Sequence, residues 1–460
     1  MRRQNESHIN QLTSFLRFPS ISADSSRKEA VKACAGWLYH HLKSVGLQAV
    51  EIHPTPLHPI VYAEHISHPS YKTILFYGHY DVQPVDPLSE WEHQPFEPVI
   101  KGDHIYARGA SDDKGQMFVH IKAIEQLLRK NGSLPVNIKC LFEGEEEIGS
   151  PHLEAFIRSH RSKLRCDVAV VSDTKMLSKN QPAITYSLRG SLNAELVIRR
   201  EGKDLHSGTF GGIVHNPADV ISRIVTSIHD ARHTVTIPGF YNAVKEPDQA
   251  ERIFMKQNGP SDEMLLQDAG VTTRWGEKGY SQYERTTTRP SVIVSGLSCG
   301  YQGEGVKNVI PTQATMKINM RLVADQNPET IADHFSLFIQ KILPAGYTHQ
   351  LKFSSMVNPV EVSRNNPYLR AVAAAYRKVF LHQPVFLRSG GTIPVVNMFG
   401  EILHVPTVLM GFALATDDMH APNEKFFLPN FFRAIQTSML FIQHVSQFTK
   451  TAKQYASPHH

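Results

Sequence analysis

Histidines and acids, the side chains that bind divalent metal ions, follow several apolar segments of this 460-residue chain. The candidates are His79 and Asp81 after the run 73–77, Asp112 and Asp113 in a glycine-flanked turn, Glu145, Glu146 and Glu147 after the run 136–142, Asp173 after the run 168–171, and His420 after the run 405–415. Taken singly, each has a structural explanation, such as a helix cap or a solvated acidic loop. The ends of parallel strands meet at one side of a sheet, so we expect these side chains to converge.

Two imidazoles with three or four carboxylates form a nitrogen and oxygen site that suits zinc, manganese or cobalt. A carboxylate shared between two ions would make the centre dinuclear. The sequence has no H-E-x-x-H segment, which excludes a mononuclear zincin. Its four cysteines form no C-x-x-C pair, so neither a thiolate zinc site nor a disulfide framework is indicated.

In their types and order, these motifs resemble a family of metal-dependent amidohydrolases and exopeptidases. That family includes aminoacylase, carnosinase-type dipeptidases and bacterial glutamate carboxypeptidase. The resemblance extends over nearly the whole chain, from Phe15-Leu-Arg-Phe-Pro-Ser-Ile-Ser to His420-Ala-Pro-Asn-Glu.

The resemblance implies a role for each motif. Asp112 would bridge two metal ions, Asp81 would orient the imidazole of His79, and Glu146 would be the general base. The implied metal ligands are His79, Asp112, Glu147, Asp173 and His420. A water activated by the two ions, with zinc favoured over manganese or cobalt, would attack an amide carbonyl while Glu146 takes its proton.

Further residues of the family pattern lie beyond the metal motifs. His206, in Asp-Leu-His-Ser-Gly, matches a lid-loop histidine that stabilises the oxyanion in the partner's active site in dimeric members. Arg321 matches an arginine that binds the terminal carboxylate of the substrate, a task that suits a bidentate guanidinium. The implied substrate-binding residues are Arg321, Ser389, Gly390, Gly391 and Thr392. The backbone N–H groups of this glycine loop could hold an anion.

The expected activity is hydrolysis of a C–N amide bond in a small substrate with a free carboxylate, as a dipeptidase or carboxypeptidase. An N-acyl-amino-acid deacylase, of the aminoacylase or desuccinylase type, is the alternative with the same centre. A catalytically silent peptide- or metal-binding protein is the alternative from another class. Carnosinase-like dipeptidases often carry an acid where this chain has Ser389, which leaves recognition of a substrate amino group open. Glu145 is an extra acid beside Glu146 and Glu147, so the general base and the metal ligand could each lie one residue earlier in the sequence.

The elements that must position these residues follow two patterns. Up to about residue 187 and again from about 356, helical and strand patterns alternate as in an α/β layer with a mostly parallel central sheet. Between them, the order βαββαβ predicts a ferredoxin-like α+β unit. We therefore expect a discontinuous catalytic domain, 1–187 and 356–460, with an inserted lid and dimerisation domain, 188–355. Residues 231–290 are polar and weakly periodic and have no assigned place.

Composition places the chain among ordinary globular proteins, with 41% hydrophobic and 20% charged residues. The formal net charge of +5 is spread along the chain and no block of basic residues is present, so a nucleic-acid partner is not expected. No apolar run reaches the roughly 18 residues of a membrane span, and no membrane partner is expected. The N-terminus shows no secretory signal, so we expect a cytoplasmic protein that acts as a homodimer on small peptides or N-acyl amino acids.

Overall fold

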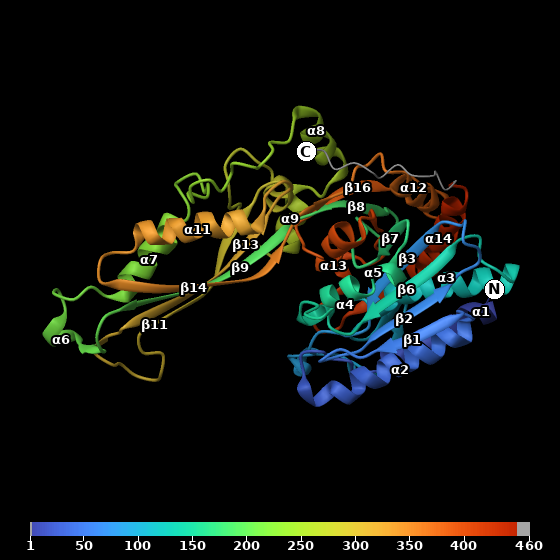
Figure 1. Cartoon of the computed structure of the whole chain (residues 1–460), viewed down its shortest axis with the longest axis horizontal. Coiled ribbons are helices and arrows are strands. Elements are labelled where there is room, and N and C mark those ends of the chain that lie inside the picture. The colour runs from blue at the N-terminus through green and yellow to red at the C-terminus, as the bar shows by residue number, and fades with distance from the viewer. Residues whose placement is uncertain (1, 449–460) are drawn as a thin grey trace. The chain divides into compact units, whose positions relative to one another are not determined.

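The structure, a computed structural model, describes residues 2–448 and divides into two units (Figure 1). The first unit contains the chain up to Tyr186, residues Val362–Leu387, and the chain from Pro394 onward. The second contains Ser187–Glu361 and Arg388–Ile393. Met1 and residues 449–460 of the predicted catalytic domain lie outside the described residues.

A large sheet forms the centre of the first unit. Its central strands, in the order β6-β3-β7-β17, are parallel and almost wholly buried. They are β6 (Asn137–Glu143), β3 (Thr73–His79), β7 (Val168–Val171) and β17 (Thr407–Leu409). Antiparallel strands β1 (Ala49–His53) and β2 (Ile60–His65) flank them on one side, and β8 (Ala183–Leu188), antiparallel to β17, flanks them on the other. Strand β16 (Val385–Ser389) pairs with β8, and the last two residues of β8, which belong to the second unit, pair with β15 (Val360–Glu361). Apolar runs of this kind are what buried parallel strands require.

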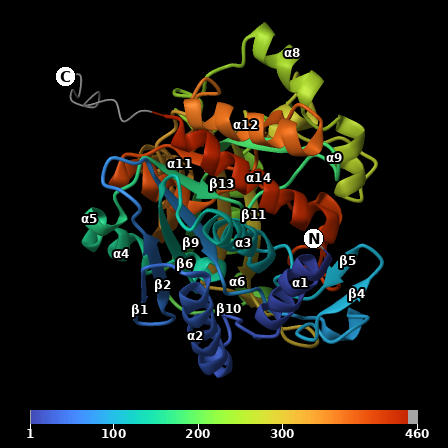
Figure 2. The same cartoon turned by 90° about the vertical axis from the view of Figure 1, so that its right-hand side faces the viewer.

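Helices cover this sheet and bury their apolar stripes against it. In Figure 1, α3 and α14 lie on one side of the sheet, and α4 and α13 lie on the other. The helices are α1 (Arg2–Leu16), α2 (Lys28–Val45), α3 (Lys114–Asn131), α4 (Leu153–Ser159), α5 (Arg161–Leu164), α12 (Pro367–Phe380), α13 (Pro394–Met398) and α14 (Leu428–Ser446). Figure 2 shows α2 and α3 from the right-hand side of the first view. Helix α2 ends at Gly46, whose φ of 99° is open to glycine but strained for other residues.

A separate three-stranded sheet in the first unit has the order β18-β5-β4. Its strands are β4 (Val99–Lys101), β5 (His104–Tyr106) and β18 (Lys425–Phe427). The pairing of β5 with β18 brings the segment before Asp112 next to the segment after His420. This small sheet therefore joins two stretches of chain that are more than 300 residues apart.

The second unit contains an antiparallel sheet in the order β11-β13-β9-β14, which is the strand order of a ferredoxin-like fold. The strands are β9 (Gly190–Arg200), β11 (Ser291–Cys299), β13 (Gln313–Leu322) and β14 (Tyr347–Val357). Helices α7 (Pro217–Ser227) and α11 (Pro328–Ile342) pack on it through a buried apolar core. Asn216 and Asn327 cap these helices, each with proline at the next position, as the two Asn-Pro pairs predict.

The remaining elements of the second unit are short. Residues 231–290 contain α8 (Gln249–Asn258), α9 (Asp262–Asp268) and α10 (Gln282–Thr287). Strand β10 (Leu205–His206) pairs with β12 (Val309–Ile310), and α6 (Ser207–Phe210) follows β10 directly.

The predicted fold class is confirmed: the first unit is α/β and the second is a ferredoxin-like α+β unit. The expectation of a parallel sheet holds for its four central strands, while the outer strands are antiparallel. Among the helices of residues 2–448, none has the length and apolar character needed to cross a membrane.

Candidate metal centre

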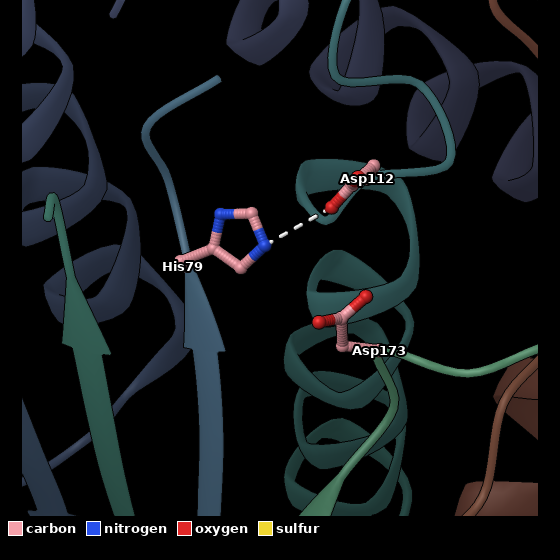
Figure 3. A group of neighbouring side chains, drawn as sticks. All are labelled: His79, Asp112 and Asp173. Atoms are coloured by element: carbon pink, nitrogen blue, oxygen red, sulfur yellow. Dashed lines mark hydrogen bonds and ion pairs between the residues drawn. The ribbon is translucent and has the colours of Figure 1, made fainter. Parts of the chain in front are cut away.

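His79, Asp112 and Asp173 form the first group of possible metal ligands. Their donor atoms all lie within 4.8 Å of one another. His79 is the last residue of β3, Asp112 lies in the turn before α3, and Asp173 follows β7 (Figure 3). His79 Nε2 is 3.1 Å from Asp112 Oδ1, and in Figure 3 the carboxyl group of Asp173 points toward the same space.

Asp112, Glu147 and His420 form the second group, with the same 4.8 Å limit between donor atoms. His420 Nε2 is 2.8 Å from Asp112 Oδ2 and 3.6 Å from Glu147 Oε2. The two oxygens of Asp112 thus face two different imidazoles. A carboxylate that bridges two ions needs this arrangement.

Asp112 does not follow a strand of the large sheet, in contrast to the expectation that all the candidates lie at strand ends. The strand before it, β5, belongs to the small sheet, and Asp112 reaches the centre from the turn before α3. Gly78 allows α3 to approach β3 here, because a Cβ at this position would lie 2.6 Å from Met117 and 2.8 Å from Asp113 Oδ2.

Asp81 positions groups on both sides of the centre. His79 Nδ1 lies 3.1 Å from the Asp81 carbonyl oxygen and 3.5 Å from the Asp81 carboxylate, so the shorter contact is to the backbone. A carbonyl only accepts, so Nδ1 carries the proton and Nε2 is left for a metal ion. The Asp81 carboxylate accepts the backbone N–H groups of Glu146 and Glu147 at 3.3 and 3.1 Å. It therefore holds the turn that carries Glu146 and Glu147.

Crowding of acids shifts the pKa values at this centre. Burial and the neighbouring Asp112 charge raise the pKa of Glu147 to about 7 and that of Asp173 to about 6. Burial also raises the pKa of Glu146 well above its ordinary value, and the charges of Asp173 and Glu147 add to that effect. Burial alone would raise the pKa of Asp112 as well, but its hydrogen bonds with His420 and His79 hold that pKa below its usual range.

The donor set fits a pair of divalent cations. Burial by itself would lower the pKa of His79, yet the carboxylates of Asp112 and Asp81 raise it well above the ordinary histidine value, so a positive charge is favoured at this place. Glu147 Oε1 is buried and has no hydrogen-bond partner among residues 2–448. Buried carboxylate oxygens are rarely left in that state unless they bind an ion or water. Two imidazoles and three carboxylates are ligands that zinc, manganese and cobalt accept.

The three consecutive acids separate in the structure. Glu145 is buried and accepts hydrogen bonds from Thr55 Oγ1, the backbone N–H of His58 and His152 Nδ1. Glu147 belongs to the second ligand group, and Glu146 lies between them on a short 3-10 turn that follows β6. Glu145 is thus engaged elsewhere, which favours the assignment of Glu146 as base and Glu147 as ligand.

The remaining candidates lie in the second unit. Arg321 NH1 donates to Thr392 Oγ1 at 2.9 Å, so the structure brings Arg321 to the glycine loop. Ser389 Oγ accepts the N–H of Gly391 at 3.1 Å. A Cβ at Gly390 would lie 2.5 Å from the carbonyl oxygen of Thr286, so this position requires glycine, whereas the position of Gly391 has space. His206 is exposed, and its Nδ1 accepts the N–H of Gly208 at the start of α6.

Sequence reasoning missed several residues around these sites. Gln83 Nε2 donates to Glu147 Oε2 at 2.7 Å. Arg189 Nε donates to the Gly390 carbonyl at 3.0 Å, and burial together with the Arg321 charge lowers the pKa of Arg189 to about 10. Glu424 contacts the backbone that carries Asp112. Gln83 and Glu424 stand within the quoted motifs or a few residues from them, which is the one signal that could have pointed to them.

Comparison with known proteins identifies the family. Residues 75–444, which include both ligand groups, match the model of peptidase family M20/M25/M40. The chain is 28% identical to the Cys-Gly metallodipeptidase dug1 of Schizosaccharomyces pombe, over 96% of each protein. It is 29% identical to the human Beta-Ala-His dipeptidase, over 85% of this chain and 78% of that protein.

A solved structure gives the same answer. The M20 family metallo-carboxypeptidase Sso-CP2 from Sulfolobus solfataricus superposes with a TM-score of 0.86, with 34% identity, over 96% of this chain and 99% of that chain. The resemblance seen in the sequence motifs and the predicted hydrolase class are therefore confirmed. The chain belongs to peptidase family M20/M25/M40 and is a metal-dependent hydrolase of peptide bonds.

Proposed function

We propose that this enzyme is a dinuclear metallopeptidase that cleaves dipeptides or removes the last residue from short peptides with a free carboxylate. The observation that supports it best is the pair of imidazoles at the two oxygens of Asp112. When bound, two divalent ions, with zinc favoured over manganese or cobalt, activate a water and polarise the substrate carbonyl. His79 and Asp173 would hold one ion, Glu147 and His420 the other, and Asp112 both.

The residues of this chain supply the proton transfers and the orientation. Glu146 takes the proton of the attacking water and passes it to the departing amine. The Asp81 carboxylate fixes the turn of Glu146, and the carbonyl of Asp81 fixes the ring of His79.

The second unit would bind the substrate. Arg321, with the backbone of Ser389, Gly390 and Gly391 and the hydroxyl of Thr392, would hold the substrate carboxylate, and the nearby Arg189 keeps this loop cationic. His206 would donate to the oxyanion of a partner subunit. In this proposal the first unit is the catalytic domain, the second is the lid and dimerisation domain, and the protein is a homodimer. The four cysteines are free, which supports a reducing, cytoplasmic location.

A substrate panel tests the proposal. Metal-free protein is loaded separately with zinc, manganese or cobalt. It is then assayed with α-dipeptides, β-Ala-His, an N-acetylated dipeptide, and N-acetyl and N-succinyl amino acids. A dipeptide amide, which lacks the carboxylate, is the matched control. We expect hydrolysis of dipeptides, and kcat/KM for the amide lower by about 100-fold, because the half-buried guanidinium of Arg321 would be left without its carboxylate partner.

Each other outcome of the panel has a definite meaning. Hydrolysis of the N-acetylated dipeptide at the rate of the free one would make the enzyme a carboxypeptidase, consistent with Ser389 in place of an acid. A preference for N-acyl amino acids over all peptides would replace the proposal with a deacylase. Metal uptake without turnover of any substrate would leave only a binding protein.

A further inference from the structure

Asp112 is carried by an irregular turn, and one distant side chain binds the backbone of that turn. Glu424 Oε2 accepts the N–H of Gly109 at 2.9 Å, and its Oε1 accepts the N–H groups of Ser111 and Asp112 at 2.9 and 3.0 Å. Arg108 NH1 donates to Oε2 as well, at 2.9 Å. Both oxygens of Glu424 are therefore occupied by donors, so this acid does not act as a metal ligand.

The contact is fully buried and charged. The side chain of Glu424 is 0% exposed and that of Arg108 is 1% exposed. Arg108 NH2 donates to the Pro84 carbonyl, which keeps the guanidinium in place. Water cannot replace these bonds, and a buried carboxylate with donors on both oxygens has one arrangement rather than several.

Glu424 also belongs to the loop of the second imidazole, four residues after His420. Asp418, His420 and Asn423 have φ values of 54°, 64° and 63°, which residues with a Cβ adopt only when their surroundings impose them. Asp417 gives this loop a second anchor, because its Oδ2 accepts from Ser111 Oγ at 2.7 Å. His420 thus meets the carboxylate of Asp112, while Glu424 holds the backbone N–H of the same residue.

We propose that Glu424 is a positioning residue for the dinuclear centre: it fixes the turn 109–112 against the His420 loop, so that the two oxygens of Asp112 face the two ion sites. This inference rests on the proposed metal centre. It assigns Glu424 no contact with substrate or metal, and it predicts that metal affinity depends on the full charge of Glu424. Losses of 10- to 100-fold in metal affinity are typical when a residue that orients a ligand is changed.

Metal titration of Glu424→Gln tests the role. Zinc is added to metal-free protein in competition with a chromophoric chelator, and the visible spectrum of the cobalt-loaded protein is recorded. The amide presents N–H groups to backbone N–H donors, so we expect zinc affinity to fall by about 10- to 100-fold and the cobalt bands to shift. Glu424→Asp keeps the charge but shortens the side chain, and we expect a smaller loss in a protein that folds.

Glu125→Gln is the matched control. Glu125 is an equally buried acid of the first unit, and it pairs with Lys122 and Arg129 on α3. We expect this variant to lower thermal stability while its zinc affinity and cobalt spectrum stay those of the wild type. Zinc affinity of folded Glu424→Gln within two-fold of the wild type would overturn the role of Glu424. If Glu424→Gln does not fold, the same result for folded Glu424→Asp, with an unchanged cobalt spectrum, would overturn it. A wild-type protein that takes up no ions would instead overturn the metal centre itself.

Discussion

At the scale of single residues, three consecutive acids have three different environments. Glu145 accepts hydrogen bonds from Thr55, His58 and His152, whereas Glu147 faces His420. Glu146 lies between them, its backbone bound to Asp81. A 3-10 turn directs neighbouring side chains about 120° apart, so Glu146 and Glu147 at the start of this turn point in different directions, as the proposed base and the proposed ligand require.

The variants Glu146→Gln and Glu145→Gln form a matched pair for this assignment. We expect Glu146→Gln to keep both ions but to lower kcat by about 10²- to 10⁴-fold, because the amide cannot accept the proton of the attacking water. We expect Glu145→Gln to keep most of its turnover and to lose thermal stability. Metal content, kcat and the unfolding temperature are measured for both. A large loss of kcat in Glu145→Gln, with kcat nearly unchanged in Glu146→Gln, would assign the general base to Glu145 instead.

The candidate ligands of the centre could be identified from the sequence motifs, but the residues that support these ligands could not. His79, Asp112 and His420 are recognised because metal chemistry demands those side-chain types. Glu424 looks like any acid in a polar loop, and its value comes from backbone N–H groups that stand over 300 residues earlier. No local pattern reports such a contact.

At the scale of elements, residues 231–290 add Val235, Ile237 and Phe240 to the apolar core of the second unit and also contain a charged and aromatic cluster. The Arg289 guanidinium stacks on Tyr241 and Tyr280 and pairs with Glu246 and Glu277. Cation–π contacts and ion pairs need no regular spacing of apolar residues, so this cluster contributes to the weak hydrophobic period of the segment. Its helices α8 and α10 contact Arg388, the residue before the loop 389–392: Tyr283 Oη accepts the N–H of Arg388 and donates to its carbonyl, and Glu251 pairs with the Arg388 guanidinium.

Removal of one hydroxyl tests whether this segment shapes the loop. In Tyr283→Phe, Arg388 loses a donor and an acceptor next to Ser389, so we expect KM for dipeptides to rise by about 5- to 20-fold with kcat nearly unchanged. Tyr280→Phe is the control, because the Tyr280 hydroxyl donates to Glu246 and not to the loop. Equal kinetics of both variants and the wild type would show that the loop keeps its shape without α10.

At the scale of the whole molecule, the candidate residues are divided between the two units. The first unit contains the candidate metal ligands together with Asp81 and Glu146. The second unit contains His206, Arg321 and the loop 389–392. The order of α/β and ferredoxin-like patterns was sufficient to predict both folds. The pairing of β5 with β18 was not predictable, because these short strands have only three residues each and carry no periodic signal.

A mixing experiment tests the homodimer and the action of His206 across it. We expect His206→Asn and Glu146→Gln each to be nearly inactive. The two variants are co-expressed in equal amounts, so that half of the dimers contain one subunit of each kind. If His206 of one subunit acts in the active site of the other, each mixed dimer has one intact site, and we expect roughly a quarter of wild-type activity. The control pair, Glu146→Gln with Asp112→Asn, damages the same unit twice and should recover none. No recovery in the first pair would rule out action of His206 in the partner.

Strand β17 has a consequence for synthesis of the protein. Every other strand of the large sheet precedes it in the chain, yet β17 lies between β7 and β8. A growing polypeptide on the ribosome thus has a gap inside its sheet, and it also lacks His420 and Glu424, which emerge after β17. With His420 as a proposed ligand and Glu424 as a proposed positioning residue, the metal centre would be incomplete until both have been translated, so hydrolysis of peptides would begin only after that point of synthesis.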